Sequence, residues 1–403
     1  MKVAARRKLM KLDFSVRGMH NRGPMQRTLN AENVKRALQH KGWSQKELAT
    51  AAGVSAQSVT NWLKGADFPR PDKLLKLATT LRLRLDQLVA AAPERAANQP
   101  VVAFRRRAAT KTTEAHIAKA QAMGALLGPL VPHLPPLRAL RTAIAQPSAA
   151  YADLQRTVAQ TRDKLGLGQQ AVLDYATLIG EFAANDAFLV PVLWGAQQHH
   201  GNALHILLPA QHVTFVYLNL DTYIEDFKFW MAHELAHVYT PDLAGTDAGE
   251  DFADAFAGAL LFPQSLAAVA YREAAGAARK ANAIAALQRH ARAHQISLFT
   301  VFCQVQAHAK AAGLPPLELN EKTDVHAVRN HQRGALVSAL LFDPLPPEPA
   351  AYVAAAHNVF GSEFFNALRR LLHAHGTGPG YLQQLLDIPL SDAAALHQIL
   401  TRG

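Results

Sequence analysis

Residues 227–240 read FKFWMAHELAHVYT, a largely apolar segment that contains two histidines and one glutamate in a fixed spacing. On a helix, His233 and His237 lie on one face, one turn apart. Both imidazoles can then bind one zinc ion, and Glu234 can act as general base toward a zinc-bound water. The alternative is a pair of solvated helical histidines, which a chain with 19 His can produce by chance.

The segments on either side of this helix support a zinc site. Residues 215–220 are aliphatic and aromatic without Gly or Pro, which predicts a strand. Residues 249–263 predict a second helix that a proline ends. Glu250 on that helix is the candidate third ligand, and Asp254, one turn later, is expected to orient a ligand histidine. The alternative for both carboxylates is a solvated acidic helix start.

The motif HELAH, followed by the block E-x-x-A-D-x-F-A-x-x-L-L-x-P from Glu250, resembles the ImmA/IrrE metallopeptidases. The resemblance extends over residues 165–263. It implies an α+β, zincin-like minimal metallopeptidase core with a small sheet, Zn²⁺ as cofactor and Glu250 as the third ligand. The family often carries Asn or Asp where Asp254 stands. One departure is the short loop between His237 and Glu250, so this connection must be compact.

Residues 28–92 predict a small all-α domain with two short helices joined by a tight turn. Ser44 begins the first helix, and Glu47 completes a capping box. Gly53 forms the turn, and Ser55 caps the second helix. Two short helices with a glycine turn and a polar face on the second are typical of a helix-turn-helix.

The pattern S-Q-x-E-L-A-x-x-x-G-V-S-x-x-x-V-x-x-W-x-x-G-x-x-x-P, from Ser44, closely resembles the Xre/lambda-repressor family. In that family the second helix enters the major groove of double-stranded DNA. The resemblance implies base contacts from Ala56, Gln57 and Asn61, and phosphate contacts from Gln45, Ser55, Ser58 and Lys64. It also implies paired half-sites and hence a homodimer. The alternative is a helix-turn-helix used only for protein contact.

Composition limits the class of protein. The chain has 403 residues, a net charge of +11 and one cysteine, Cys303, so no disulfide framework exists and a reducing cytoplasm is expected. There is no long apolar run for a membrane helix and no secretory signal. Residues 1–27 hold eight basic side chains against one acid, which predicts a disordered arm along phosphates or a wrongly chosen start.

The rest of the chain predicts a multidomain, mainly α protein. Residues 93–150 are expected to form a linker, with a triple arginine at 105–107, and short helices. Residues 151–275 are expected to form the peptidase core and residues 276–403 a helical C-terminal region. Within the core, residues 187–220 predict a sheet whose edge can receive an extended peptide. The histidines of this segment, His199, His200, His205 and His212, are interpreted as surface or satisfied side chains.

These patterns together predict a DNA-binding transcription regulator with a zinc peptidase domain. By resemblance, the peptidase acts on a repressor-type protein, a toxin partner or the chain itself in a stress, mobile-element or toxin–antitoxin circuit. Two alternatives stay open. The peptidase fold can serve only as a sensor or interaction module in a repressor or antitoxin, or the protein can be a general zinc peptidase with incidental DNA affinity.

Overall fold

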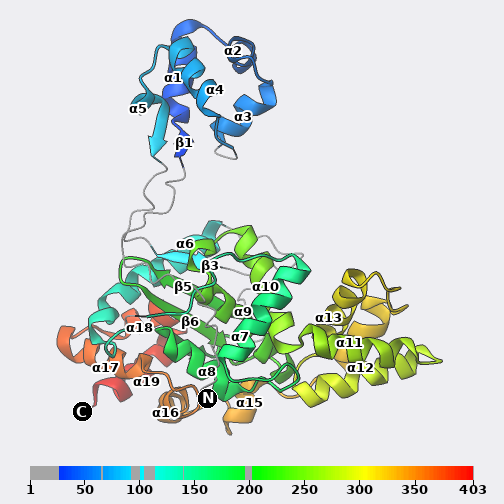
Figure 1. The fold of residues 1–403 in the computed structure, drawn as a ribbon. Coiled ribbons are helices and arrows are strands. Elements are labelled where there is room, and N and C mark those ends of the chain that lie inside the picture. The colour runs from blue at the N-terminus through cyan, green and yellow to red at the C-terminus, as the bar shows by residue number, and fades with distance from the viewer. Residues whose placement is uncertain are drawn as a thin grey trace, which may run out of the picture. The chain divides into compact units, whose positions relative to one another are not determined.

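The computed structural model describes residues 27–64, 67–91, 100–103, 114–138, 140–195 and 202–402. The chain divides into two units, Met1–Ala97 and Asn98–Gly403, and each is described by itself. Most of the basic arm, the arginines at 105–107, His199 and His200 lie outside the described residues. The described chain is mostly helical, with small sheets (Figure 1).

The N-terminal unit is a bundle of short helices closed by a two-stranded sheet. Its elements are β1 (Arg27–Leu29), α1 (Ala31–Lys41), α2 (Gln45–Ala52), α3 (Ala56–Leu63), α4 (Pro71–Leu81), α5 (Leu85–Leu88) and β2 (Val89–Ala91). β1 pairs antiparallel with β2, so the two ends of the unit lie together. The expectation of an all-α unit missed this sheet, because its pairing joins residues about 60 positions apart that carry no local signal.

Local capping explains where α2 and α3 begin. The backbone N–H of Glu47 donates to Ser44 Oγ over 3.3 Å, and the N–H of Ser44 donates to Glu47 Oε2 over 2.6 Å, which completes the predicted capping box. Gly53 ends α2 with φ +65°, a conformation that favours glycine. Buried apolar side chains from all five helices then form one small core that includes Leu48, Val59 and Trp62.

The second unit is built on a four-stranded sheet of order β3-β5-β6-β4. The strands are β3 (Val101–Ala103), β4 (Ala187–Val192), β5 (Ala203–Leu208) and β6 (Val213–Asn219). β5 pairs antiparallel with β6 and with β3, and β4 pairs parallel with β6. The strands expected within residues 187–220 are present, whereas β3 comes from the segment expected to be a linker.

The two faces of this sheet are covered by different helices. Successive strand residues point to opposite faces, so Val216 and Leu218 pack in one apolar cluster and Phe215 and Tyr217 in the other. α6 (Glu114–Leu127), α17 (Phe364–His375), α18 (Pro379–Leu386) and α19 (Leu390–Thr401) contribute to the second cluster. The C-terminal helices therefore cover the sheet of the same unit.

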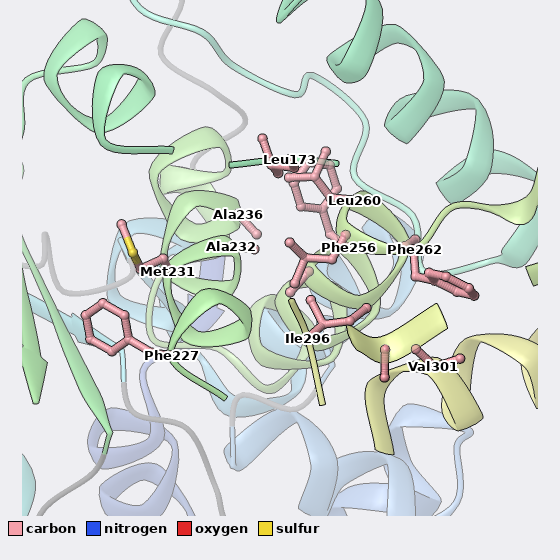
Figure 2. Packing of buried hydrophobic residues seen from close by; sticks show 14 of the residues in the cluster. Leu173, Phe227, Met231, Ala232, Ala236, Phe256, Leu260, Phe262, Ile296 and Val301 are labelled. Carbon is pink, nitrogen blue, oxygen red and sulfur yellow. The ribbon is translucent and has the colours of Figure 1, made fainter. Parts of the chain in front are cut away.

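The first cluster lies against α9 (Ile224–Tyr239) and α10 (Asp247–Leu261), which carry HELAH and the acidic block. Figure 2 shows Ala232 and Ala236 of α9 near Phe256 and Leu260 of α10, with Ile296 and Val301 beyond. The small alanine side chains let the two helices pack closely, with Phe256 and Leu260 of α10 in the same apolar cluster. The helix pair thus lies in the core of the unit.

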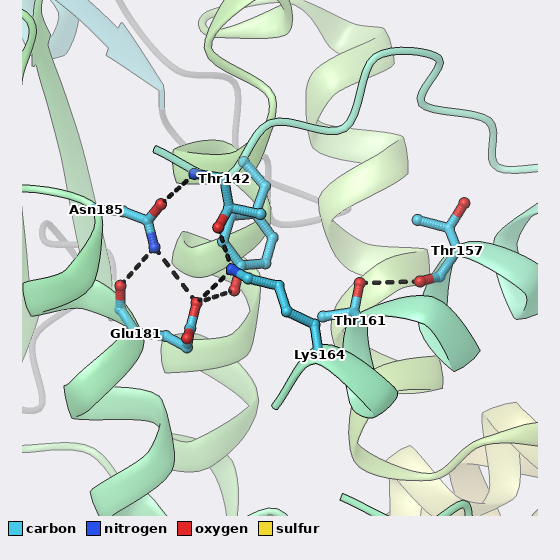
Figure 3. A network of polar contacts seen from close by, with 7 residues as sticks. Thr142, Thr157, Thr161, Lys164, Glu181 and Asn185 are labelled. Atoms are coloured by element: carbon cyan, nitrogen blue, oxygen red, sulfur yellow. Dashed lines mark hydrogen bonds and ion pairs between the residues drawn. The ribbon is translucent and has the colours of Figure 1, made fainter. Parts of the chain in front are cut away.

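A polar network fixes the C-terminal end of α9. Tyr239 donates its hydroxyl hydrogen to Glu181 Oε2 over 2.6 Å, and Lys164 Nζ lies 3.4 Å from the same oxygen. Figure 3 shows Glu181 also accepting from Asn185, which in turn accepts from the Thr142 backbone. The network links α9 to α7 (Tyr151–Lys164) and α8 (Tyr175–Ala184), close to His237.

The remaining elements extend the first cluster and complete the unit. They are η1 (Gly128–His133), η2 (Pro241–Leu243), α11 (Gln264–Ala275), α12 (Lys280–His294), α13 (Leu298–Ala311), η3 (Glu321–His326), α14 (Ala327–His331), α15 (Val337–Leu341) and α16 (Pro349–Asn358). Among the described residues no single helix could span a membrane; α10 and α11 would pass only as a pair bent by 72°.

Candidate metal centre and DNA-binding face

The helix α9 presents its two histidines inside the protein. Acidic Glu225 and Asp226 lie in its first turn, where their negative charges interact favourably with the helix dipole. His233 is 0% exposed, His237 is 1% exposed and Glu234 is 4% exposed. The three motif residues are therefore buried. This burial disagrees with the alternative, in which the two histidines are solvated on a helix surface.

A compact connection brings α10 back along α9. Residues 240–246 include the short helix η2, and Thr246 Oγ1 accepts from the Gly249 backbone N–H over 3.1 Å to cap α10. A Cβ at Gly249 would lie 2.3 Å from the Leu243 carbonyl oxygen, so only glycine fits there. The short loop noted in the sequence thus suffices, and it carries Glu250 to the histidines.

Three ligand atoms converge between the two helices. His233 Nε2 and His237 Nε2 are 3.2 Å apart. The Glu250 carboxylate oxygens lie 3.5 Å from His233 Nε2 and 3.4 Å from His237 Nε2. With metal–ligand bonds of about 2.0–2.1 Å, neighbouring ligand atoms of a tetrahedral zinc are about 3.3–3.4 Å apart. The separation of the two imidazole nitrogens fits such an ion, and each histidine has a different Glu250 oxygen near that distance, Oε2 for His233 and Oε1 for His237.

The hydrogen bonding of this cluster is incomplete. Within the described residues, His237 Nδ1, Glu234 Oε2 and both Glu250 oxygens are buried and have no hydrogen-bond partner. Buried polar atoms are seldom left in this state, because each costs free energy unless it is paired. A cation bound to the three converging groups would satisfy both Glu250 oxygens.

Burial and neighbouring charges shift the pKa values of this cluster in opposite directions. Burial by itself lowers the pKa of His233, but its contacts with Asp254 and Glu250 outweigh burial and raise that pKa to about 9. Burial raises the pKa of Glu250, but its contacts with His233 and His237 lower that pKa to about 2. An ionised carboxylate thus faces two imidazoles, a site where a metal ion competes with protons.

Two further side chains adjoin the three ligand candidates. Asp254 Oδ1 lies 3.0 Å from His233 Nδ1, the ring nitrogen away from the convergence point, as expected for a residue that orients a ligand. His205 Nδ1, on β5, lies 3.5 Å from Glu234 Oε2, and its ring centroid is 5.4 Å from that of His237.

The interpretation of His205 as a surface or satisfied histidine is wrong. His205 is 1% exposed, its Nδ1 has no hydrogen bond among the described residues, and burial lowers its pKa. The alternation of side chains along a strand could have indicated this position. His205 lies on the same face of β5 as Ala203, which belongs to the apolar cluster that includes α9. His212, by contrast, is exposed.

The candidate DNA-binding residues lie together on α2, α3 and the turn between them. Gln57 and Ala56 are exposed, and Gln57 Nε2 donates to Asn61 Oδ1 over 2.8 Å. Ser55 Oγ accepts from the Ser58 backbone N–H over 3.0 Å and thereby caps α3. Gln45 and Lys64 are exposed at the ends of this polar face.

Comparison with known proteins addresses the N-terminal unit. Residues 34–88 match the family model described as helix-turn-helix. No curated protein and no solved structure matches the chain. The matched residues begin within α1 and end at the last residue of α5, so they include α2, the Gly53 turn and α3. The N-terminal unit is therefore an Xre-like helix-turn-helix, and the protein is a DNA-binding transcription regulator.

Proposed function

We propose that the second unit of this regulator is a zinc peptidase, and that it cleaves a repressor-type protein, a toxin partner or the regulator's own linker at residues 105–107. The convergence of His233, His237 and Glu250 carries the proposal, because one ligand atom from each residue lies within 4.8 Å of the other two, and both histidines are buried. A bound zinc ion would polarise the peptide carbonyl and activate a water molecule.

Three protein ligands are the number that a catalytic zinc site uses, because a fourth position remains for water or substrate. Asp254, at His233 Nδ1, holds the ring so that Nε2 points to the ligand position. The resemblance to the ImmA/IrrE peptidases supports the same assignment of roles.

Glu234 is the proposed general base. Its carboxylate lies in the buried cluster, and its Oε2 has no hydrogen-bond partner within the described residues. It can therefore accept a proton from the water that attacks the peptide carbonyl, and then donate that proton to the departing amine. The peptide C–N bond breaks, and the attacking water supplies the new C–O bond.

The enclosure of the site favours a second candidate, a metal-dependent sensor or antitoxin module without cleavage. His233 and His237 are almost fully buried, and a strand of the chain itself lies along β5 beside them. In this case zinc binding would be retained while no partner is cut. Metal content and proteolysis therefore need separate measurements.

The test compares wild type with Glu234→Gln, beside Glu318→Gln as a control at an exposed glutamate. Zinc is quantified on each pure protein, and each is incubated with proteins encoded nearby and analysed by intact mass. We expect stoichiometric zinc in all three and cleavage in wild type and Glu318→Gln only. Zinc without cleavage by wild type promotes the sensor, and cleavage by Glu234→Gln refutes the mechanism.

The DNA-binding roles form a separate part of the proposal. Ala56, Gln57 and Asn61 contact base edges, and Gln45, Ser55, Ser58 and Lys64 contact phosphates. A homodimer on paired half-sites is the proposed assembly. Light scattering that shows only monomer, with a footprint over one half-site, would remove the dimer.

A further inference from the structure

The outer edge of β5 is occupied by a short segment that follows the DNA-binding unit in the sequence. β3 pairs antiparallel with β5 in the register Val101–Leu207, Val102–Ile206 and Ala103–His205. The segment is therefore an extended peptide added to a sheet edge, which is how many proteins bind a partner peptide.

The segment leads directly to the candidate catalytic residues. Ala103 is paired with His205, and His205 Nδ1 lies 3.5 Å from the proposed base Glu234. A peptide in this register therefore places its backbone beside the metal centre.

The loop between α9 and α10 closes over the other side of β3. A Cβ on Gly245, where φ is +70°, would lie 3.0 Å from the Val102 carbonyl oxygen and 3.6 Å from Val101 Cγ1. Gly245 belongs to the connection between the helices that carry His237 and Glu250. β3 thus lies in a slot bounded by β5 and by a loop of the metal centre.

β3 is held more weakly than the strands beside it. It makes only three residue pairs, whereas β5 and β6 make six. Besides these pairs, the segment is held through its preceding residue, Pro100, which packs so closely on α6 that a Cβ on Gly124 would lie 2.4 Å from Pro100 Cβ. Short edge elements with few contacts open at lower free energy than the core.

We propose that β3 is an internal occupant of the peptide-binding edge, and that an extended substrate segment pairs antiparallel with β5 in its place. The proposal rests on the peptidase function and adds how the substrate is presented: its residue opposite His205 lies next to Glu234. While β3 is paired, the edge is closed to other peptides. The tethered segment competes at an effective concentration on the order of millimolar.

The experiment measures peptide binding in full-length protein that carries Glu234→Gln, with a chelator present, so that neither cleavage nor metal enters the result. The probe is a fluorescent synthetic peptide of residues 99–105. A matched peptide with proline at both valine positions cannot pair as a strand. Two changes are designed to weaken β3. One is the double variant Val101→Asp/Val102→Asp, and the other is Gly124→Ala, whose Cβ would lie 2.4 Å from Pro100 Cβ and 3.2 Å from Ile206 Cγ2 on β5.

The controls carry the same chemical changes elsewhere. The first control, Leu390→Asp, adds an acid at a 52% exposed leucine. The second control is Gly180→Ala inside α8, where an added Cβ meets nothing within 4 Å. We expect both weakened variants to bind the probe at least tenfold more tightly than the parent, the two controls to match the parent, and the proline peptide to bind to none.

Weakened variants that keep the parent's circular dichroism but bind no more tightly would overturn the proposal. Failure of both weakened variants to fold, while the controls fold, would also overturn it, because β3 would then be an integral strand that covers an edge. Loss of the proposed peptidase activity does not affect this readout. Peptide binding without cleavage by any metal-loaded protein would refute the function and keep the binding edge.

Discussion

The polar face of α3 and the cluster between α9 and α10 place polar side chains in opposite surroundings. Gln57 is exposed and hydrogen-bonded to Asn61. Its polar side chain therefore has no desolvation cost in the protein without DNA. His233 and Glu250 are enclosed, and both Glu250 oxygens have no hydrogen-bond partner among the described residues. The enclosed cluster carries a desolvation cost, which the ion pairs within it offset in part and a bound cation would offset further.

The two sites differ in how many separate elements of the fold must be in place to form them. The DNA-binding face needs a helix with a cap and a small core, all within about 60 residues, as expected for a domain with its own core. The metal centre needs two helices, a compact loop and a strand. We therefore expect changes at the metal centre to leave DNA binding intact, and the predictions below test that separation.

The largest effect is expected from removing a ligand. His237→Ala leaves two of the three converging groups, so zinc affinity should fall at least about a hundredfold. This is more than the usual loss when a residue that only orients a ligand is removed. Zinc per chain is measured after dialysis, with the exposed His373→Ala as control. Operator binding should equal that of wild type. Wild-type zinc content in His237→Ala would remove this residue from the site.

A smaller loss is expected at Asp254. Asp254→Ala removes the carboxylate at His233 Nδ1 and should weaken zinc binding about 10–100-fold. Asp251→Ala, at an exposed position of the same helix, should leave the affinity unchanged. Competition with a chromophoric chelator measures both variants. Equal affinities for the two would show that Asp254 does not orient the ligand.

At the DNA face, Asn61→Ala or Gln57→Ala should cost about 1–3 kcal/mol of operator binding. Either change also breaks the hydrogen bond between the two side chains, so the double variant should lose less than the sum. Lys64→Ala should weaken operator and random DNA equally and reduce the salt slope. Titrations with both DNAs measure this, and an equal loss on both for Asn61→Ala would contradict a base contact.

Short-range signals explain what the sequence alone could predict. The capping box at Ser44, the turn at Gly53 and the spacing of His233 and His237 lie within a few residues, and each is present. Of the strands within residues 187–220, all were expected from apolar runs.

Long-range pairing explains what it could not. β3 looked like a linker, because a three-residue strand has no period and its partner lies about 100 residues away. The position of His205 beside Glu234 follows from the same sheet and from the packing of α9 upon it. The finer division of the second unit into domains stays a prediction.

The smallest expected effect concerns another buried charge on α9. Lys228 is 0% exposed and donates to the His294 carbonyl oxygen over 3.1 Å and to Gln295 Oε1 over 3.2 Å. Its Nζ also lies 5.0 Å from the Tyr175 ring centroid. Here a carbonyl, an amide and an aromatic ring surround the charge, whereas the metal centre leaves its polar atoms for a ligand.

Burial lowers the pKa of Lys228 from 10.5 to about 8. Between these values the unfolded chain binds more protons than the folded one, so the free energy of unfolding should rise with pH. Relative to Lys228→Met, wild type should gain roughly 1 kcal/mol between pH 8 and pH 9. Urea titrations of both proteins with a chelator, followed by tryptophan fluorescence, measure this gain. The two proteins share every other titrating group, so the metal centre cancels in the difference. Parallel curves from pH 8 to pH 9 would mean that Lys228 has an ordinary pKa, and that the surrounding oxygens and ring fully compensate its burial.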